Sequence, residues 1–259
     1  MVASITPHAL RNLISTFMVD YQARPDIRDW WRPPLLVTAR ADDRFDILST
    51  IAADNHLLPF ELLPDAETVI VFFIPFQQSL GKENADGQFP CRNWALAYEA
   101  TNELIGLMAD KIAAYLVDRG FQVAQTPATH NFDPKKLVAR WSHKHLAFVS
   151  GLGRFGINAQ MITPAGCAGR LGSLVTNAVI ADSPLVDDDE LCLHKRGEAC
   201  LACVSRCPVQ AVAESGIDRQ RCWDRLIFNR TRLDALAGMQ DSTHVCGKCV
   251  VDLPCSANG

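Results

Sequence analysis

The first two thirds of the chain alternate between helical and strand-like patterns of apolar residues. After Thr6 and Pro7, which suit the cap and first turn of a helix, apolar residues recur at helical spacing and predict one buried face. The run 69–76, VIVFFIPF, is apolar, β-branched and aromatic, and it predicts a strand buried on both faces. Residues 93–119 predict a long helix that ends at Gly120.

Four further patterns complete this region. A shorter helix is expected around 45–51, and a strand at 121–125. The Asp-Pro pair at 133–134 predicts another helix, capped by Asp133, that runs to about Ser150. Residues 171–180, LGSLVTNAVI, return to strand character. The pattern therefore predicts a mixed body, α/β or α+β, and leaves its strand order open.

Composition and charge narrow the class of protein. The 259 residues are 48% hydrophobic and 21% charged, which is typical of a globular chain. A net charge of −4 gives no electrostatic footprint for nucleic acid, so we do not expect tRNA or DNA as the main partner. No secretory signal is visible, and the longest apolar run, 69–76, is far short of the ~20 residues of a membrane span. We therefore expect a soluble, cytoplasmic protein that makes no use of a membrane.

The cysteines divide the chain into two parts. Of the 10 cysteines, only Cys91 and Cys167 lie in the first 191 residues, and we expect both to be small buried side chains. The other eight crowd into the last 68 residues. This break predicts a body, 1–184, followed by a cysteine-dense tail, 185–259, with the acidic run 187–190 as a solvated linker. In the cytosol such thiols are more often metal ligands or redox groups than disulfides.

The tail contains most of a bacterial ferredoxin motif. Cys200-x2-Cys203-x3-Cys207-Pro208 matches the run C-x2-C-x2-C-x3-C-P except at its first position, which is Gly197 here. Cys192 is the nearest substitute. Eight cysteines suit two [4Fe–4S] clusters, and in the ferredoxin run the last cysteine crosses to the other cluster. The predicted sets are Cys192, Cys200, Cys203 and Cys255 for one cluster, and Cys207, Cys222, Cys246 and Cys249 for the other.

Zinc is the alternative to iron in the tail. The two C-x2-C pairs, 200/203 and 246/249, would build a tetrahedral site of four thiolates. Zinc would leave the other four cysteines without a role and would not require the extension to Cys207 and Pro208. Disulfides or free thiols are a third interpretation.

Three glycines form a nucleotide-like motif just before residue 160. Gly151, Gly153 and Gly156 match G-x-G-x-x-G, but a helix rather than a strand is expected before them. The nearest following acid, Asp182, lies 26 residues beyond Gly156. The context therefore argues against a dinucleotide site. The remaining interpretations are a tight helix-to-strand turn and a loop that lies against a flat cofactor.

With both halves in view, the chain resembles the epoxyqueuosine reductase family and, more distantly, the reductive dehalogenases. The resemblance covers roughly 60–255 and rests on CLACVSRCPVQAV (200–212), Cys222 in RCWDRL, the pair 246/249 with the final Cys255, and AFVSGLGRFGIN (147–158). It implies an α+β protein: a nitroreductase-like, cobalamin-binding α/β sandwich followed by a bacterial-ferredoxin-like domain with two [4Fe–4S] clusters. Cobalamin is thus a possible cofactor beside the clusters.

The resemblance also suggests site residues in the body. Gly151, Gly153, Gly156 and Asn158 match the family's A-G-L-G-W-I-G-K-N segment and are candidates for cofactor binding, while Ile157 replaces its lysine. The family's catalytic aspartate corresponds to Leu137, and the nearby Asp133 is the catalytic candidate, although helix capping also explains it. His143 and Lys144 are further cofactor-site candidates that, with Arg140, would line a polar or anionic pocket.

These features lead to two functional hypotheses of different classes. In the first, the protein is an iron–sulfur oxidoreductase in which a ferredoxin or flavodoxin donates low-potential electrons, and two clusters pass them to a cobalamin or a small-molecule substrate in the body. The chain stops four residues after Cys255, without the helical-repeat extension many epoxyqueuosine reductases use near tRNA, so a short paralogue with another substrate is expected. The second is a non-catalytic electron carrier or reductive activator of a partner enzyme. A zinc-stabilised binding module is a third possibility.

Overall fold

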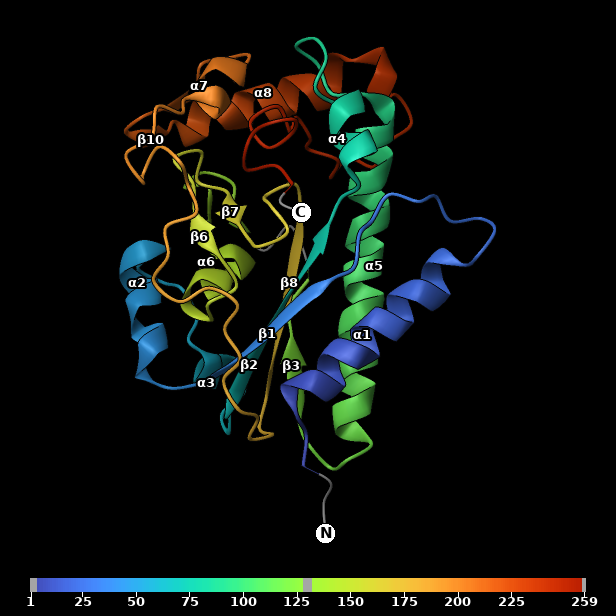
Figure 1. Cartoon of the computed structure of the whole chain (residues 1–259), viewed down its shortest axis with the longest axis vertical. Coiled ribbons are helices and arrows are strands. Elements are labelled where there is room, and N and C mark those ends of the chain that lie inside the picture. Colours follow the sequence, from blue (N-terminus) through green and yellow to red (C-terminus); the bar gives the residue numbers. More distant parts are fainter. Residues whose placement is uncertain (1–3, 128–131, 258–259) are drawn as a thin grey trace.

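A four-stranded antiparallel sheet lies between two layers of helices (Figure 1). The computed structural model describes residues 4–127 and 132–257. The strand order is β1-β2-β8-β3. The helices α1 and α5 cover one face of the sheet, and α2, α3 and α6 cover the other (Figure 1). The strands are β1 (Leu35–Arg40), β2 (Thr68–Pro75), β3 (Val123–Gln125) and β8 (Gly169–Thr176), and the helices are α1 (Pro7–Gln22), α2 (Leu48–Ile51), α3 (Pro59–Leu62), α5 (Arg92–Val117) and α6 (His143–Val149).

The central strand β2 shows why this is a three-layer structure. All eight of its residues are buried, as its continuous apolar sequence predicts. Ile70, Phe72 and Ile74 join the core under α1 and α5, whereas Val69 and Val71 join the core on the other face. Alternate side chains of a strand point to opposite faces, so one uninterrupted apolar strand supplies two cores.

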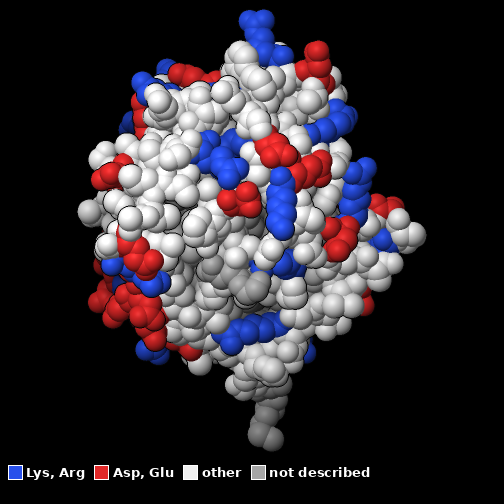
Figure 2. All heavy atoms as spheres, turned by 45° about the horizontal axis from the view of Figure 1, so that its top comes forward, with Lys and Arg blue, Asp and Glu red and all other residues white. Residues whose placement is uncertain are grey.

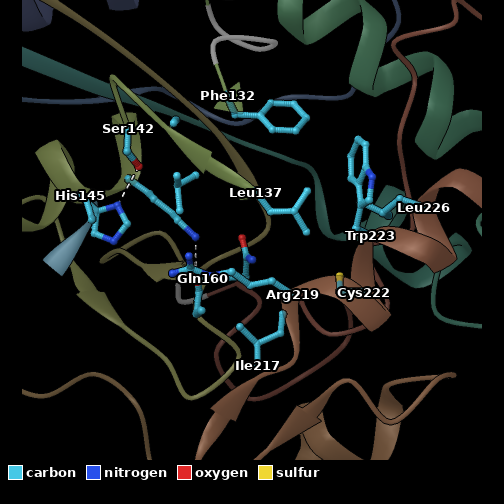
Figure 3. Close-up of a pocket in the computed structure, with 15 residues that line it drawn as sticks. Phe132, Leu137, Ser142, His145, Gln160, Ile217, Arg219, Cys222, Trp223 and Leu226 are labelled. Carbon is cyan, nitrogen blue, oxygen red and sulfur yellow. Dashed lines mark hydrogen bonds between the residues drawn. The ribbon is translucent and has the colours of Figure 1, made fainter. Parts of the chain in front are cut away.

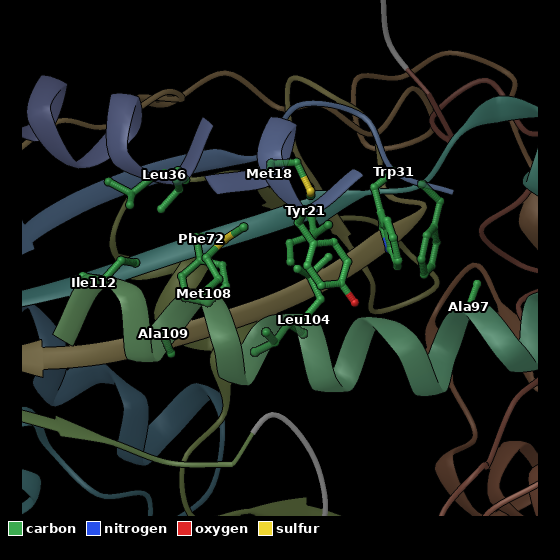
Figure 4. Packing of buried hydrophobic residues seen from close by; sticks show 14 of the residues in the cluster. Met18, Tyr21, Trp31, Leu36, Phe72, Ala97, Leu104, Met108, Ala109 and Ile112 are labelled. Atoms are coloured by element: carbon green, nitrogen blue, oxygen red, sulfur yellow. The ribbon is translucent and has the colours of Figure 1, made fainter. Parts of the chain in front are cut away.

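The helices α1 and α5 were both predicted, and the structure confirms them. The Thr6 Oγ1 accepts a hydrogen bond from the Ala9 amide at 3.2 Å, which caps α1 as expected. The 26-residue helix α5 runs along the whole sheet and is capped by the Cys91 sulfur, which accepts from the Trp94 amide. Figure 4 shows Met18 and Tyr21 of α1 facing Leu104 and other apolar side chains of α5 across this core.

Two local predictions were wrong or incomplete. The strand β1 was not predicted; it begins directly after Pro33 and Pro34, which interrupt the apolar pattern before it. The helix expected from Asp133 to Ser150 is instead a hairpin, β4 (Phe132–Asp133) and β5 (Val138–Ala139), followed by the short α6. The Asp133 carboxylate accepts the Lys135 and Lys136 amides, but it caps a turn that Leu137 closes at a φ of 54°.

Other boundaries differ by a few residues. The helix expected around 45–51 is a 3-10 turn, η1 (Asp43–Ile47), continued by α2. The strand expected at 171–180 is β8, which begins at Gly169 and ends at Thr176. The remaining body elements are α4 (Gln78–Glu83), β6 (Arg154–Phe155) and β7 (Met161–Ile162).

The cysteine-rich tail has little regular structure and lies across one end of the sheet and of α5, at the top of Figure 1. Leu236, Met239, Val245 and Val251 of the tail are buried in the same apolar core as α1 and α5. In Figure 2, which brings this end forward, basic side chains are interleaved with acidic ones. The tail elements are α7 (Ala202–Arg206), β9 (Val212–Ala213), β10 (Gly216–Ile217), α8 (Arg219–Arg232) and η2 (Asp234–Leu236).

Polar contacts also join the tail to the body. The ammonium of the buried Lys248 donates to the carbonyl oxygens of Asn84 at 2.5 Å and Asp86 at 2.8 Å. The Asn84 side chain donates to the Cys246 carbonyl at 2.9 Å.

The division into 1–184 and 185–259 remains a prediction from composition. Among the described residues, none of the helices has the length and apolar character needed to cross a bilayer.

Candidate functional site

The structure gathers four tail cysteines around one small cavity. Cys192, Cys200, Cys203 and Cys255 line it together with Gly156 and Asn158 of the body. Burial, with smaller contributions from Cys255, Cys192 and Cys200, raises the pKa of Cys203 to about 11. The sulfur atoms thus lie near enough to one another to interact electrostatically.

The other four tail cysteines also lie near one another. Burial raises the pKa of Cys222 to about 11, with smaller contributions from Cys246 and Cys207. The pKa of Cys249 is raised by burial and then by Cys246, Cys222, Cys207 and Cys203. Since Cys203 belongs to the first group, the two groups are neighbours. Within residues 4–127 and 132–257, no three Cys, His, Asp or Glu side chains form a site for a single metal ion.

The two body cysteines have different surroundings. Cys91 is half-buried at the start of α5. Cys167 is buried, and its sulfur lies 3.9 Å from that of Cys255, a contact that together with burial raises the pKa of Cys167. The Cys167 amide donates to the Cys255 carbonyl at 2.9 Å. The backbone around Cys255 is therefore held directly by the body.

The glycine loop packs against the chain itself. A Cβ on Gly151 would lie 2.6 Å from the Pro184 side chain, and a Cβ on Gly153 would collide with the Ile162 carbonyl. Gly156 borders the first cysteine cavity. The buried Asn158 donates through Nδ2 to the Cys249 carbonyl at 2.6 Å. The loop thus places Gly156 and Asn158 beside the tail cysteines, while Gly151 and Gly153 serve close backbone packing.

A larger cavity of about 300 Å³ lies between the body and α8 (Figure 3). In Figure 3, Ser142 and His145 stand on the left, Trp223 of α8 stands on the right, and Phe132 and Leu137 lie between them. Cys222 reaches the cavity from the tail. The complete lining is Ala52, Phe132, Leu137, Val138, Ala139, Ser142, Lys144, His145, Ala159, Gln160, Ile217, Arg219, Cys222, Trp223 and Leu226.

Two titratable side chains of α6 line this cavity. Lys144 donates to the Ala159 carbonyl at 3.2 Å, and burial, with a contribution from Arg219, lowers its pKa to about 8. The His145 Nδ1 lies 2.7 Å from the Ser142 hydroxyl, and burial lowers the pKa of His145 to about 3. At neutral pH, Lys144 is therefore mainly charged and His145 is neutral.

His143 belongs to an adjoining cavity of about 280 Å³. Its Nδ1 lies 2.7 Å from the Ser173 hydroxyl and its Nε2 lies 3.2 Å from the Pro127 carbonyl. Burial lowers the pKa of His143 to about 4, with a smaller contribution from the charge of Arg170. His143 and Lys144 both line the adjoining cavity, but of the two only Lys144 also lines the larger cavity.

The weak catalytic candidate Asp133 lies outside both cavities. Its side chain is exposed, and the amides of Lys136 and Lys135 lower the pKa of its carboxyl. Leu137, which replaces the family's aspartate, is the residue that lines the larger cavity. The described lining of this cavity therefore presents an apolar side chain where the resemblance implies an acid.

Comparison with solved structures shows which proteins have this fold. An epoxyqueuosine reductase in complex with an epoxyqueuosine-modified tRNA-Tyr stem loop gives a TM-score of 0.57 at 15% identity, covering 95% of this chain and 66% of that one. The epoxyqueuosine reductase of Streptococcus thermophilus gives 0.55 at 16% identity, covering 96% and 67%. A catabolic reductive dehalogenase in complex with 3-bromo-4-hydroxybenzoic acid gives 0.55 at 13% identity, covering 83% and 28%. The chain shares the fold of these reductases.

The likeness is one of fold, not of close sequence. The chain matches no known family profile and no curated protein sequence. It spans 66% of an epoxyqueuosine reductase and 28% of a dehalogenase. A further reductive dehalogenase with this fold, at a TM-score of 0.54, is described as a B12-dependent enzyme. Identities of 13–16% over the matched regions leave activity and cofactors to be inferred from this chain's own residues.

Sequence reasoning missed several residues of the larger cavity. Arg219, Trp223 and Leu226 lie on α8, and Gln160 follows the glycine loop. Their proximity to Cys222 in sequence was a usable signal for the first three, because Arg219 and Leu226, at i−3 and i+4, share the helix face of Cys222, and Trp223 is its direct neighbour. No sequence signal places Gln160 there.

Proposed function

We propose that this protein is an iron–sulfur oxidoreductase that passes electrons through two [4Fe–4S] clusters to a small molecule in the cavity beside Cys222. The observation that carries this proposal is the position of Cys222. It lines the 300 Å³ cavity and also lies near Cys207, Cys246 and Cys249. An electron on a cluster held by these four residues would be next to the cavity.

The donor sets suit two cubane clusters. Cys192, Cys200, Cys203 and Cys255 would hold the first cluster, since they surround one cavity. Cys207, Cys222, Cys246 and Cys249 would hold the second. Four thiolates are the usual ligands of a [4Fe–4S] cluster, and burial that disfavours free thiolates is relieved when iron binds them. In this arrangement Cys192 replaces the ligand missing at Gly197.

The arrangement gives a direction for electron flow. Since Cys203 and Cys249 are neighbours, the two clusters would exchange electrons over a short path. The first cluster, beside the exposed Leu201, would receive single electrons from a low-potential donor such as a ferredoxin or flavodoxin. The second would deliver them to the cavity, where a two-electron reduction consumes two electrons and two protons. The Lys144 ammonium would supply one of these protons, and water entering the cavity would supply the other.

Cobalamin does not fit the cavities in their present shape. A corrin with its side chains is larger than a ligand that would fill the 300 Å³ cavity and the adjoining cavity of about 280 Å³ together. The hairpin residues Phe132 and Ala139 line both the larger and the adjoining cavity, so a corrin would have to displace the hairpin. The proposed electron path therefore ends on the substrate itself.

A second candidate is a non-catalytic electron carrier or reductive activator. Leu201, directly after Cys200, is 37% exposed and would give a partner enzyme access to the first cluster. The two candidates differ in what happens inside the 300 Å³ cavity. A reductase needs that cavity for its substrate, whereas a carrier does not.

Anaerobic purification of the full chain, followed by measurement of iron, cobalt and zinc, tests the proposal. We expect about eight irons per chain and cluster signals in electron paramagnetic resonance after reduction by dithionite. Cys222→Ser and Cys200→Ser should each lose about half of the iron, whereas the control Cys91→Ser should lose none. Zinc in place of iron would refute the proposal. Stoichiometric cobalt would show that the hairpin moves to admit a corrin.

A second measurement separates the reductase from the carrier. In the reductase, Lys144→Met and Trp223→Ala should slow reoxidation of the reduced clusters by small-molecule acceptors that enter the cavity, without altering reoxidation by an acidic protein acceptor. Equal rates for the variants and the unaltered chain with every acceptor would favour the carrier.

A further inference from the structure

The larger and the adjoining cavity are in contact and share part of their lining. Phe132, Ala139, Ser142, Lys144 and Gln160 line both, so the two spaces of about 300 and 280 Å³ adjoin each other. Lys144 thus stands between them.

Three cationic side chains line these cavities, and none of their described lining residues is an acid. Lys144 faces both cavities, Arg219 lines the larger one, and Arg170 lines the adjoining one. The two histidines present, His143 and His145, are held neutral by burial. Among the charged side chains of the described lining, these three are all positive, and a cluster held at Cys222 would add negative charge on one side of the larger cavity only.

The cations have few protein partners of opposite charge. The Lys144 ammonium carries three N–H donors, and its hydrogen bond within the described residues is to the Ala159 carbonyl. The buried Nε of Arg170 has no hydrogen-bond partner, and its guanidinium lies 4.2 Å from the centre of the Tyr98 ring. Next to Arg219, the Asp218 carboxylate is directed to Arg221 instead.

Lys144 and Arg170 are half-buried, whereas Arg219 is exposed. Burying a cation costs free energy unless an anion accompanies it, and this applies to Lys144 and Arg170. Charge-assisted hydrogen bonds from an ammonium or guanidinium to a carboxylate or phosphate are about twice as strong as neutral ones. Leu137, Trp223 and Leu226 add apolar side chains to the lining of the larger cavity. The lining as a whole suits a molecule with an anionic group on an apolar body.

We propose that the two cavities form one site for a small organic anion, a carboxylate or a phosphate ester, held by Lys144 between Arg170 and Arg219. The inference rests on the proposed function in taking this anion to be the molecule that receives the electrons. The apolar part lies against Trp223 and Leu226, next to Cys222.

Isothermal titration calorimetry on the anaerobically purified full chain tests the charge requirement. Three probes of similar shape are compared: benzoate, phenyl phosphate and the neutral benzamide. We expect at least one anion to bind about tenfold or more tightly than benzamide. The stronger of the two anions identifies the group as a carboxylate or a phosphate. Equal binding of all three probes, or no binding of any, would overturn the proposal.

Matched variants test the residues. Lys144→Met should weaken binding of the preferred anion about tenfold or more and leave benzamide unaffected, and Arg170→Gln and Arg219→Gln should each weaken it severalfold. The controls are Lys111→Met, an exposed lysine on α5, and Arg232→Gln, an exposed arginine at the far end of α8, and neither should change the affinity. If the Lys144→Met variant bound the preferred anion as tightly as the Lys111→Met variant does, the proposal would also be overturned. If the Lys144→Met variant fails to fold, the two arginine variants and the comparison of the three probes still test the anion site.

Iron analysis of the same samples separates this inference from the proposed function. A chain with about eight irons that distinguishes no anion refutes the anion site and leaves the cluster proposal standing. A chain without iron that still prefers benzoate to benzamide refutes the cluster proposal alone.

Discussion

The body and the tail of this protein are held together by different means. The body has a sheet buried between two apolar cores, and in β2 every residue is buried. The tail has short elements, and its α8 has a single buried residue, Asn229. It is fixed by a few apolar side chains inserted under α5, by polar contacts such as that of Lys248, and in our proposal by two clusters. Apolar burial thus specifies the body, whereas ligands and directed hydrogen bonds specify the tail.

The largest expected difference between the two regions follows removal of the clusters. Oxidation and chelation of iron should expose the amides of α8 and of residues 243–257 to hydrogen exchange about a hundredfold faster, because metal binding supplies much of the folding free energy of such segments. The amides of β2 and β8 should stay protected. Hydrogen exchange with mass spectrometry measures both regions in one sample. Equal loss of protection in both would show that the body also depends on the clusters.

A substitution in the body should have the next largest effect. Phe72→Ala removes a side chain that is 0% exposed, and we expect it to lower the free energy of unfolding by about 3–5 kcal/mol. Phe60→Ala is the matched control, since Phe60 is 57% exposed and should change stability by about 0.5 kcal/mol or less. Denaturant unfolding gives both values. A loss below about 1 kcal/mol for Phe72→Ala would contradict the two-core description.

The contact of Lys248 tests the polar attachment of the tail. Lys248→Met leaves the Asn84 and Asp86 carbonyls without their donor and should cost about 1–3 kcal/mol. Lys82→Met, on the exposed side of α4, is the control and should cost little. Iron content is measured alongside unfolding, so that loss of a cluster is recognised. A stability equal to that of Lys82→Met would show that the tail does not need this contact.

The smallest predicted effect is a pH dependence of the free energy of unfolding, and it arises from the body alone. Burial holds the pKa of His143 near 4, below its usual value of 6.5, so the unfolded chain binds a proton there that the folded chain does not. Stability from this residue is therefore present above about pH 6.5 and is lost as the pH falls towards 4, by about 2 kcal/mol between pH 7 and 5. Unfolding curves of the unaltered chain and of His143→Gln should differ in pH dependence by this amount. If the free energy of unfolding of the unaltered chain and of His143→Gln changed with pH in the same way, the titrating group would be a residue other than His143.

The sequence was most informative where a single local pattern decides the structure. The apolar periodicity of α1 and the uniform burial of β2 follow directly from their own residues. Asp133 shows the limit of such reasoning. Its carboxylate does accept the amides that follow it, as a helix cap would, but the same two hydrogen bonds also form in a turn. Local hydrogen bonding alone does not choose between a helix and a hairpin.

The candidate site was predictable only in the part that a local sequence pattern describes. The spacing of the tail cysteines suggested two groups of four, and the structure places members of each group near one another. The cationic cavity was only partly predictable. Lys144 was a candidate from its position before the glycine loop, but Arg170 is on β8 and Arg219 is on α8. Contacts between such distant segments depend on how the tail packs on the body, which no local pattern encodes.

The contact between Cys255 and Cys167 has a consequence for the order in which parts of the protein assemble during synthesis. A ribosome releases Cys192, Cys200 and Cys203 well before Cys255, and the Cys255 carbonyl then accepts the Cys167 amide of the body. With the ligand set proposed above, a nascent chain would hold three of the four thiols of the first cluster until Cys255 is synthesised. That cluster would then be completed only after the body segment that binds the Cys255 backbone has been made.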